Sequence, residues 1–202
     1  MTFQYRWPWT YKLFIPLTQR KHVLEAFKQA VGVDVTVLDV AGGFGHMRRA
    51  MDSSVIYRGI DINKTFIAYA QKRGTDMRYG DIFYPSAYES SDVVVMSDVL
   101  HHIPRDKWPD LLRLTLSSAQ QRLVILEPAF LGVSNRNRMF GPLVDWLFKK
   151  LDNDGTGEVE TWYTKDEYVA MLEGGLGLKE ADEFSFSCED VFPYLLITYS
   201  RK

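Results

Sequence analysis

Residues 35–45 read Val-Thr-Val-Leu-Asp-Val-Ala-Gly-Gly-Phe-Gly, an apolar, β-branched run that ends in three glycines within four positions. β-Branched residues favour a strand, which here extends through Asp39 to Val40. Glycine has no Cβ, so a glycine-rich turn can adopt positive φ and let a ligand approach the backbone closely. The stretch therefore predicts a strand and a tight turn that passes next to a bound nucleotide-like ligand.

Short apolar runs alternate with helical patterns from about residue 35 to residue 127, which is typical of βαβ units. The runs are continuously apolar, as expected for a parallel sheet with helices on both faces. They predict strands at residues 35–40, 55–60, 77–79, 92–97 and 123–127. Asn63 is predicted to cap one helix, and a second helix begins near Asp106 with Pro109 in its first turn. Two final strands, residues 178–187 and 194–200, are predicted to pair antiparallel.

Two stretches lie outside this alternation, residues 1–34 and about 128–177. The first is aromatic and then shows a helical pattern through Leu24 and Phe27; the second contains an amphipathic pattern over 140–151 and a helix from Lys165 to about Glu173. Insertions at strand ends commonly form lids over a ligand. The aromatic residues fit either a lid over an apolar or lipid-linked acceptor, or the core of a helical cap. The residues in these stretches that we expect to contact the molecule beneath such a lid are Tyr5, Tyr11 and Arg136.

The bulk composition describes an ordinary globular chain. Its 202 residues suit one α/β domain spanning 1–202, and 46% of them are hydrophobic. The net charge of −2 argues against nucleic acid as a partner. A single cysteine, Cys188, allows no internal disulfide and no cysteine metal cluster. No signal peptide or apolar run long enough for a membrane span is evident, so we expect a cytoplasmic protein. Whether it is a monomer or a homodimer stays open.

Two further acids follow predicted strands. Asp61 ends the second strand in Gly59-Ile60-Asp61, where a carboxylate can accept hydrogen bonds from both hydroxyls of a ribose. Asp81 follows the third strand, where a carboxylate can accept from the amino group of an adenine. Because the carboxyl ends of parallel strands share one edge of a sheet, both acids are expected near the glycine turn.

With these acids, the chain resembles the class I S-adenosylmethionine-dependent methyltransferases. Their motif D-x-G-x-G-x-G matches residues 39–45, except that Ala41 replaces the first glycine. The resemblance implies a three-layer Rossmann-like fold with a seven-stranded sheet of order 3-2-1-4-5-7-6, an antiparallel last strand, and S-adenosylmethionine as cofactor. The cofactor contacts that it implies are Asp39, Ala41, Gly42, Gly43, Gly45, Asp61, Ile62, Asp81, Ile82, Ser97 and Asp98.

The acceptor side is less sharply defined. His101 and His102 follow the fourth strand, close to the expected acceptor, where an imidazole could remove a proton from an attacking hydroxyl or amine. Alternatively, one histidine caps the next helix and the other packs under the cofactor. Glu127, at the end of the fifth strand, could orient the acceptor or the following helix, or could be a solvated loop carboxylate.

The resemblance predicts methyl transfer to an oxygen, nitrogen or carbon of a small molecule, such as a glycan, lipid, quinone or secondary metabolite, with release of S-adenosylhomocysteine. Peripheral association with a membrane through a lipid-linked acceptor is compatible with this prediction. One alternative is a regulatory or scaffold protein that binds the cofactor without turnover. A second is an NAD-dependent oxidoreductase, which is disfavoured because Arg48 stands where the fingerprint G-x-G-x-x-G needs its third glycine.

Overall fold

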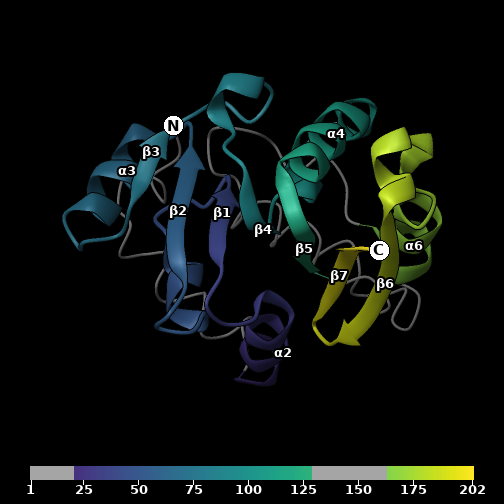
Figure 1. Ribbon diagram of the computed structural model, residues 1–202, viewed down its shortest axis with the longest axis horizontal. Helices are drawn as coiled ribbons and strands as arrows, with labels where there is room; N and C mark the ends of the chain where they lie inside the picture. Colours follow the sequence, from purple (N-terminus) through teal and green to yellow (C-terminus); the bar gives the residue numbers. More distant parts are fainter. Residues whose placement is uncertain (1–20, 129–162) are drawn as a thin grey trace, which may run out of the picture.

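The computed structural model describes residues 21–128 and 163–202. Its centre is a seven-stranded sheet of order β3-β2-β1-β4-β5-β7-β6, with β7 antiparallel to both β5 and β6. The strands are β1 Thr36–Val40, β2 Ile56–Asp61, β3 Met77–Tyr79, β4 Ser91–Ser97, β5 Ala119–Pro128, β6 Phe184–Val191 and β7 Tyr194–Arg201. Figure 1 shows β3 with α3 at one end of the sheet and β6 with α6 at the other. The predicted fold class and strand order are confirmed.

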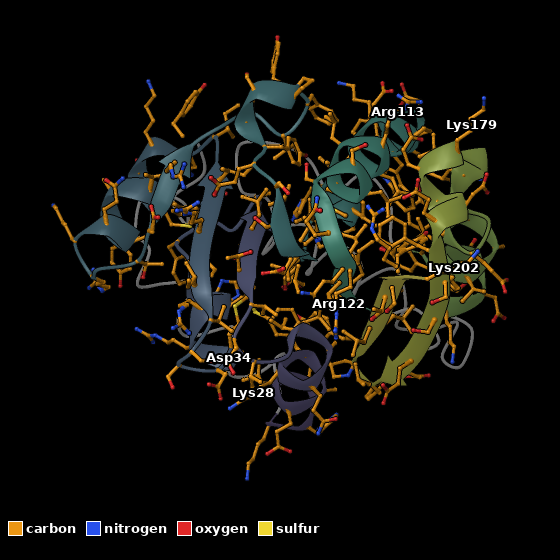
Figure 2. The ribbon with its side chains drawn as sticks, in the orientation of Figure 1. Lys28, Asp34, Arg113, Arg122, Lys179 and Lys202 are labelled. Carbon is orange, nitrogen blue, oxygen red and sulfur yellow. The ribbon has the colours of Figure 1, made fainter. Side chains whose placement is uncertain are left out.

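Helices cover both faces of the sheet and bury two separate apolar clusters. The α-helices are α2 Lys21–Val31, α3 Lys64–Gln71, α4 Trp108–Ser118 and α6 Lys165–Leu172. α2, α3 and the short 3-10 helix η2 (His46–Ala50) pack on one face, through side chains such as Phe27, Met47 and Ile67. α4 and α6 pack on the other face, through side chains such as Trp108 and Tyr168. Charged residues such as Lys28, Arg113 and Lys202 lie at the periphery (Figure 2).

Local sequence signals explain several helix boundaries. The side chain of Asn63 accepts hydrogen bonds from the N–H groups of Thr65 and Phe66, so the predicted cap of α3 is confirmed. Pro109 lies in the first turn of α4, where its missing N–H leaves no helical bond unmade. α6 begins with a capping box in which Thr164 and Glu167 bond each other's backbone N–H groups.

The strand bounds differ from prediction at the end of the chain. The five parallel strands lie where the sequence placed them, although β5 begins earlier, because Ala119 already pairs with Ser91 of β4. The strand predicted at 178–187 is displaced: Lys179–Glu183 forms 3-10 turns, and β6 runs from Phe184 to Val191. The pairing with β7 decides this, because its register extends from Phe184 opposite Arg201 to Val191 opposite Tyr194.

Part of the predicted acceptor region lies outside the described residues. That part contains Tyr5, Tyr11, Arg136 and the helix predicted at 140–151. Among residues 21–128 and 163–202, no helix has the length and apolar character needed to cross a bilayer.

Candidate cofactor and acceptor site

The glycine loop, residues 41–45, lies directly on the ends of β1 and β2. The Gly42 N–H donates to the carbonyl of Ile60 at 3.1 Å, and the Gly45 N–H donates back to Gly42 at 2.9 Å. A Cβ on Gly42 would lie 2.7 Å from Oδ2 of Asp39, closer than real Cβ contacts. Gly42 is therefore required where the loop crosses the end of β1.

The loop begins with a strained residue. Ala41 has φ +57°, in the left-handed region that favours glycine, and Gly43 follows at φ +58°. An L-residue with a Cβ pays about 1–2 kcal/mol for this conformation. Ala41 therefore adopts a backbone conformation that the first glycine of the related motif would adopt without strain.

Asp61, at the end of β2, joins the glycine loop to the second strand. Its Oδ2 accepts the N–H of Gly43 at 2.8 Å, and its Oδ1 accepts the N–H of Asn63 at 2.7 Å. The side chain is 8% exposed. The Asp61 carboxylate thus bridges the glycine loop and the start of α3.

Asp39 lies beneath the loop instead of beside it. Its side chain is 1% exposed, and the hydroxyl of Tyr57 donates to its Oδ2 at 2.6 Å. Oδ1 has no hydrogen-bond partner in the described part of the chain. Burial raises the pKa of Asp39 to about 7, although the Tyr57 hydrogen bond works in the opposite direction. The Asp39 side chain thus supports the loop from below, and its contact with a cofactor stays a prediction.

The third strand ends close to the second. The N–H of Gly80 donates to the carbonyl of Asp61 at 3.0 Å, which holds the two strand ends together. Asp81 follows and is partly buried; its Oδ1 accepts the N–H of Phe83 at 3.0 Å. The carbonyl of Ile82 accepts the hydroxyl of Tyr88, whereas the side chain of Ile62 is exposed.

The fourth strand ends in a sharp turn. The hydroxyl of Ser97 donates to Oδ2 of Asp98 at 3.2 Å, and Asp98 adopts φ +58°. Aspartate tolerates this left-handed conformation better than most residues. The turn directs the chain into the 3-10 helix η4, Leu100–His102, which carries both histidines.

Glu127 organises that turn from β5. Its Oε1 accepts the N–H groups of Val99 at 2.7 Å and Leu100 at 2.8 Å. Its Oε2 bonds Nδ1 of His101 at 2.8 Å and accepts the hydroxyl of Tyr168 at 3.3 Å. The side chain is 0% exposed, so the alternative of a solvated loop carboxylate is wrong. The role that Glu127 has toward an acceptor stays a prediction.

The environment of Glu127 favours its ionised form. Burial alone would raise its pKa, but attraction to His101, the His101 hydrogen bond and the N–H groups of Leu100 and Val99 together lower the pKa below its ordinary value. Because an ionised carboxylate can only accept hydrogen bonds, Nδ1 of His101 carries a proton. When His101 is neutral, its lone pair therefore lies on Nε2.

The two histidines occupy different environments. His101 is 1% exposed and held by Glu127, whereas His102 is partly buried. Their ring centroids lie 4.1 Å apart. The sequence could not distinguish the two residues, and the structure separates them through the Glu127 contact.

Tyr57 and Tyr168 complete this site but were absent from the sequence-based predictions. Tyr57 lies at the start of β2 and bonds Asp39 across 18 positions of the chain, while Tyr168 lies on α6 and bonds Glu127 across 41. Neither tyrosine lies at the carboxyl end of a strand, so no local pattern marks it. Only the packing of β2 beside β1, and of α6 against β5, brings each hydroxyl to its carboxylate.

These residues fit an adenosyl ligand by the geometry of the chain itself. Asp61 presents a carboxylate at the loop, and Asp81 presents a second one at the next strand end. Among residues 21–128 and 163–202, only Phe66, at 3.9 Å, comes within 4 Å of the position that a Cβ on Gly43 would take. The cradle therefore combines acceptors for hydroxyl and amino groups with a close backbone approach.

Comparisons with known proteins agree with this fold. Residues 38–115 match the family model of a methyltransferase domain. The magnesium protoporphyrin IX methyltransferase of Synechocystis with bound S-adenosylhomocysteine is similar at 17% identity and a TM-score of 0.61, over 89% of this chain and 80% of that one. The search of curated proteins found no match.

Two further solved structures show how widely the fold is shared. Human N-acetylserotonin methyltransferase, in complex with S-adenosylmethionine, has 19% identity and a TM-score of 0.64 over 94% of this chain, which spans 53% of that longer one. A possible histamine N-methyltransferase from Thermotoga maritima has 10% identity and a TM-score of 0.63 over 98% of both chains. At these identities the structural similarity shows the fold.

Proposed function

From the methyltransferase-domain match over residues 38–115 and the class I, Rossmann-like methyltransferase fold, we propose that this chain binds S-adenosylmethionine and transfers its methyl group to a small-molecule acceptor. The observation that carries the proposal is the 2.8 Å hydrogen bond from the Gly43 N–H to Asp61, because it combines the glycine loop and the second-strand acid in one cradle.

The cradle residues have separable roles in this proposal. Asp61 accepts the ribose hydroxyls, Asp81 and the backbone at Ile82 hold the adenine, and the loop with Ser97 lies along the methionyl part. The bound cofactor supplies an electrophilic methyl group on a positively charged sulfur. The chain then has to align the acceptor with that methyl group and exclude water, which needs little covalent chemistry from the protein.

We assign proton handling to the His101–Glu127 pair. Glu127 holds Nδ1, so Nε2 is the atom that would receive a proton from an attacking hydroxyl or amine. His102 lies against the His101 ring and is the more accessible of the two. We therefore assign His102 a packing role at the entrance to this pair.

Calorimetry with S-adenosylhomocysteine and with NAD tests the cofactor. We expect binding of the first and none of the second, and Asp61→Asn should weaken S-adenosylhomocysteine binding by about tenfold or more, because it loses charge-assisted hydrogen bonds. Asp110→Asn, on the exposed side of α4, is the matched control and should bind normally. Binding of NAD alone, or unchanged affinity in folded Asp61→Asn, would reject the cofactor assignment.

Release of S-adenosylhomocysteine with a panel of acceptors tests turnover. The panel should include N-acetylserotonin, histamine, a quinol and a monosaccharide, which present different nucleophilic atoms. His101→Asn should lower kcat and alter its pH profile, whereas His102→Asn should change KM more than kcat. If both variants lose the same small fraction of their activity, the two histidines have a packing role and neither receives the proton. Tight cofactor binding with no turnover on any acceptor would favour a binding protein.

A further inference from the structure

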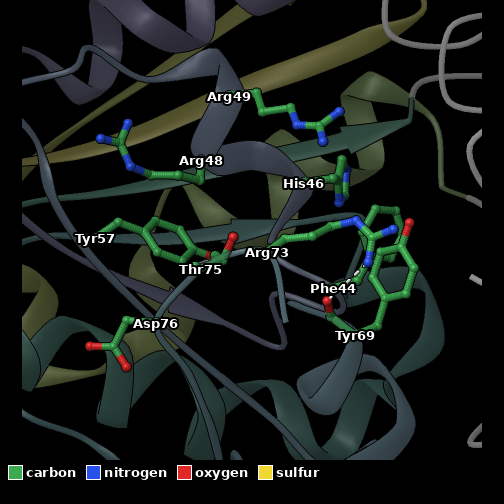
Figure 3. A pocket seen from close by; sticks show the side chains of 11 residues that line it. Phe44, His46, Arg48, Arg49, Tyr57, Tyr69, Arg73, Thr75 and Asp76 are labelled. Atoms are coloured by element: carbon green, nitrogen blue, oxygen red, sulfur yellow. Dashed lines mark hydrogen bonds between the residues drawn. The ribbon is translucent and has the colours of Figure 1, made fainter. Parts of the chain in front are cut away.

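A cavity lies on the face of the sheet that carries α3 and η2. It has a volume of about 350 Å³ and extends from Phe44, through η2, to the last turn of α3 and the residues before β3 (Figure 3). This size lies in the range of small-molecule sites. The strand-end residues Asp61, Asp81 and Ser97 are not part of its lining, whereas Phe44 and Gly45 of the glycine loop are, so the cavity adjoins the loop on its η2 side.

The lining of this cavity is strongly basic. Arg48, Arg49 and Arg73 contribute three guanidinium groups, and none of them forms an ion pair in the part of the chain that the structure describes. Arg48 donates only to backbone carbonyls, those of Asp52 and Ser53, which leave its charge uncompensated. The one lining carboxylate, Asp76, already lies between Arg58 at 3.9 Å and Arg78 at 3.7 Å.

Aromatic rings lie beside one of the arginines. The Arg73 guanidinium lies over the Tyr69 ring, 3.6 Å from its centroid. Phe44 contacts both Tyr69 and His46, with centroid distances of 6.0 Å and 5.1 Å. Figure 3 shows Arg49 and Arg73 extending toward the side of the cavity where these rings lie. Positive charge and aromatic surface are thus presented together.

The positive charge of this cavity also affects the pKa of His46. Burial, and after it the positive charge of Arg49, lowers the pKa of His46 to about 4. An anion bound beside Arg49 would offset this charge and would therefore raise the pKa of His46.

We propose that this cavity, on the η2 side of the glycine loop, is a binding site for a small aryl or otherwise planar phosphate. The phosphate is held by Arg49 and Arg73, whose planar guanidinium groups match its oxygen atoms in pairs, and the planar body lies against Phe44 and Tyr69. A carboxylate carries less charge and would compensate fewer of the three guanidinium groups.

Calorimetric titration with phenyl phosphate tests the site. We expect binding to the full chain that persists in the presence of saturating S-adenosylhomocysteine, because the two sites do not share strand-end residues. The double variant Arg49→Ala/Arg73→Ala should weaken it by about tenfold or more, because two charge-assisted contacts are lost. Neither expectation depends on methyl transfer, so the outcome is independent of the proposed function.

A matched variant and two probes define the controls. Arg113→Ala removes an exposed arginine at the α4 end of the molecule, whereas α3 lies at the other end of the sheet, and it should bind phenyl phosphate normally (Figure 2). Benzyl alcohol, which lacks the charge, and inorganic phosphate, which lacks the ring, should both bind more weakly. Equal binding of inorganic phosphate, equal losses in Arg113→Ala, or no binding of phenyl phosphate would overturn the proposal.

The His46 ring provides a second readout. Its NMR signal, assigned with His46→Gln among the four histidines of the chain, should titrate at higher pH when phenyl phosphate is bound, because the phosphate offsets the charge of Arg49. Binding that leaves the His46 titration unchanged would place the ligand elsewhere and contradict the proposal.

Discussion

Two buried carboxylates at strand ends behave in opposite ways. Asp39 on β1 and Glu127 on β5 are 1% and 0% exposed, and they lie on opposite faces of the same sheet. Glu127 interacts with four partner groups, and its pKa is lowered. Within the described ranges the Asp39 side chain bonds the Tyr57 hydroxyl alone, and its pKa is raised to about 7.

The difference shows that, at equal burial, the partner groups decide the charge of these acids: Glu127 has the attraction of His101 and several hydrogen bonds, whereas Asp39 has one hydrogen bond. Removing an ion from water costs several kcal/mol, and a hydrogen bond to a charged group returns about 1.5–3 kcal/mol. Four partners can offset the burial of Glu127, whereas one donor cannot offset that of Asp39. The sheet thus holds a charged acid at the proposed proton-handling pair and, beneath the glycine loop, an acid that loses its proton only near neutral pH.

The largest effect is expected where the donors are most numerous. Glu127→Ala should lower the free energy of unfolding by about 3–5 kcal/mol, because it leaves His101 and two backbone N–H groups buried without their acceptor. Denaturant unfolding of purified protein measures this loss. Glu127→Gln keeps the shape of the side chain but not its charge, so its free energy of unfolding should lie between those of Glu127→Ala and the parent. A loss below about 1 kcal/mol in Glu127→Ala would contradict the account of the network.

Asp39→Asn tests whether Asp39 makes the stability of the protein depend on pH. Folded Asp39 keeps a proton that the unfolded chain releases between about pH 4 and pH 7, so the free energy of unfolding of the parent should fall as pH rises through this range. The maximum slope from one such group is about 1.4 kcal/mol per pH unit. Asp39→Asn should lose this contribution, while the control Asp110→Asn keeps it. Parallel stability profiles for Asp39→Asn and the parent would show that Asp39 does not titrate as described.

Tyr57→Phe removes the single donor of Asp39. We expect a loss of about 1–3 kcal/mol in unfolding free energy, because a buried acceptor loses its partner. The pH range over which stability declines should also move upward, since the hydroxyl is the group that lowers the pKa of Asp39. Both changes can be followed by denaturant unfolding at several pH values. If that range stays in place, Tyr57 does not control the ionisation of Asp39.

Tyr168→Phe should have the smallest effect. The hydrogen bond from its hydroxyl to Oε2 of Glu127, at 3.3 Å, is the longest of the four Glu127 contacts. Three partners of Glu127 remain after its removal. We expect less than about 1 kcal/mol of destabilisation, measured in the same way. A loss as large as that in Tyr57→Phe would mean that the ionisation of Glu127 depends on each donor separately.

Local patterns in the sequence predicted much of the fold and the positions of the acids. The apolar runs predicted the five parallel strands, and Asn63 predicted the start of α3. Asp61 and Asp81 were recognised because an acid directly after an apolar run is a local feature. The 3-10 turns at Lys179–Glu183 were not predicted, because the start of β6 depends on its register with β7.

The sequence by itself determined the order of the elements and the strand ends at which the glycine loop, the acids and the histidines lie, since these features follow from residues close together in the chain. The tertiary structure decided which of those acids is charged, which histidine is held, and where three arginines gather beside aromatic rings. These properties depend on contacts such as Tyr57 with Asp39 and Tyr168 with Glu127, whose partners are 18 and 41 residues apart. Desolvation and hydrogen bonding act through space, so their balance at a buried carboxylate exists only once the sheet and its helices are packed.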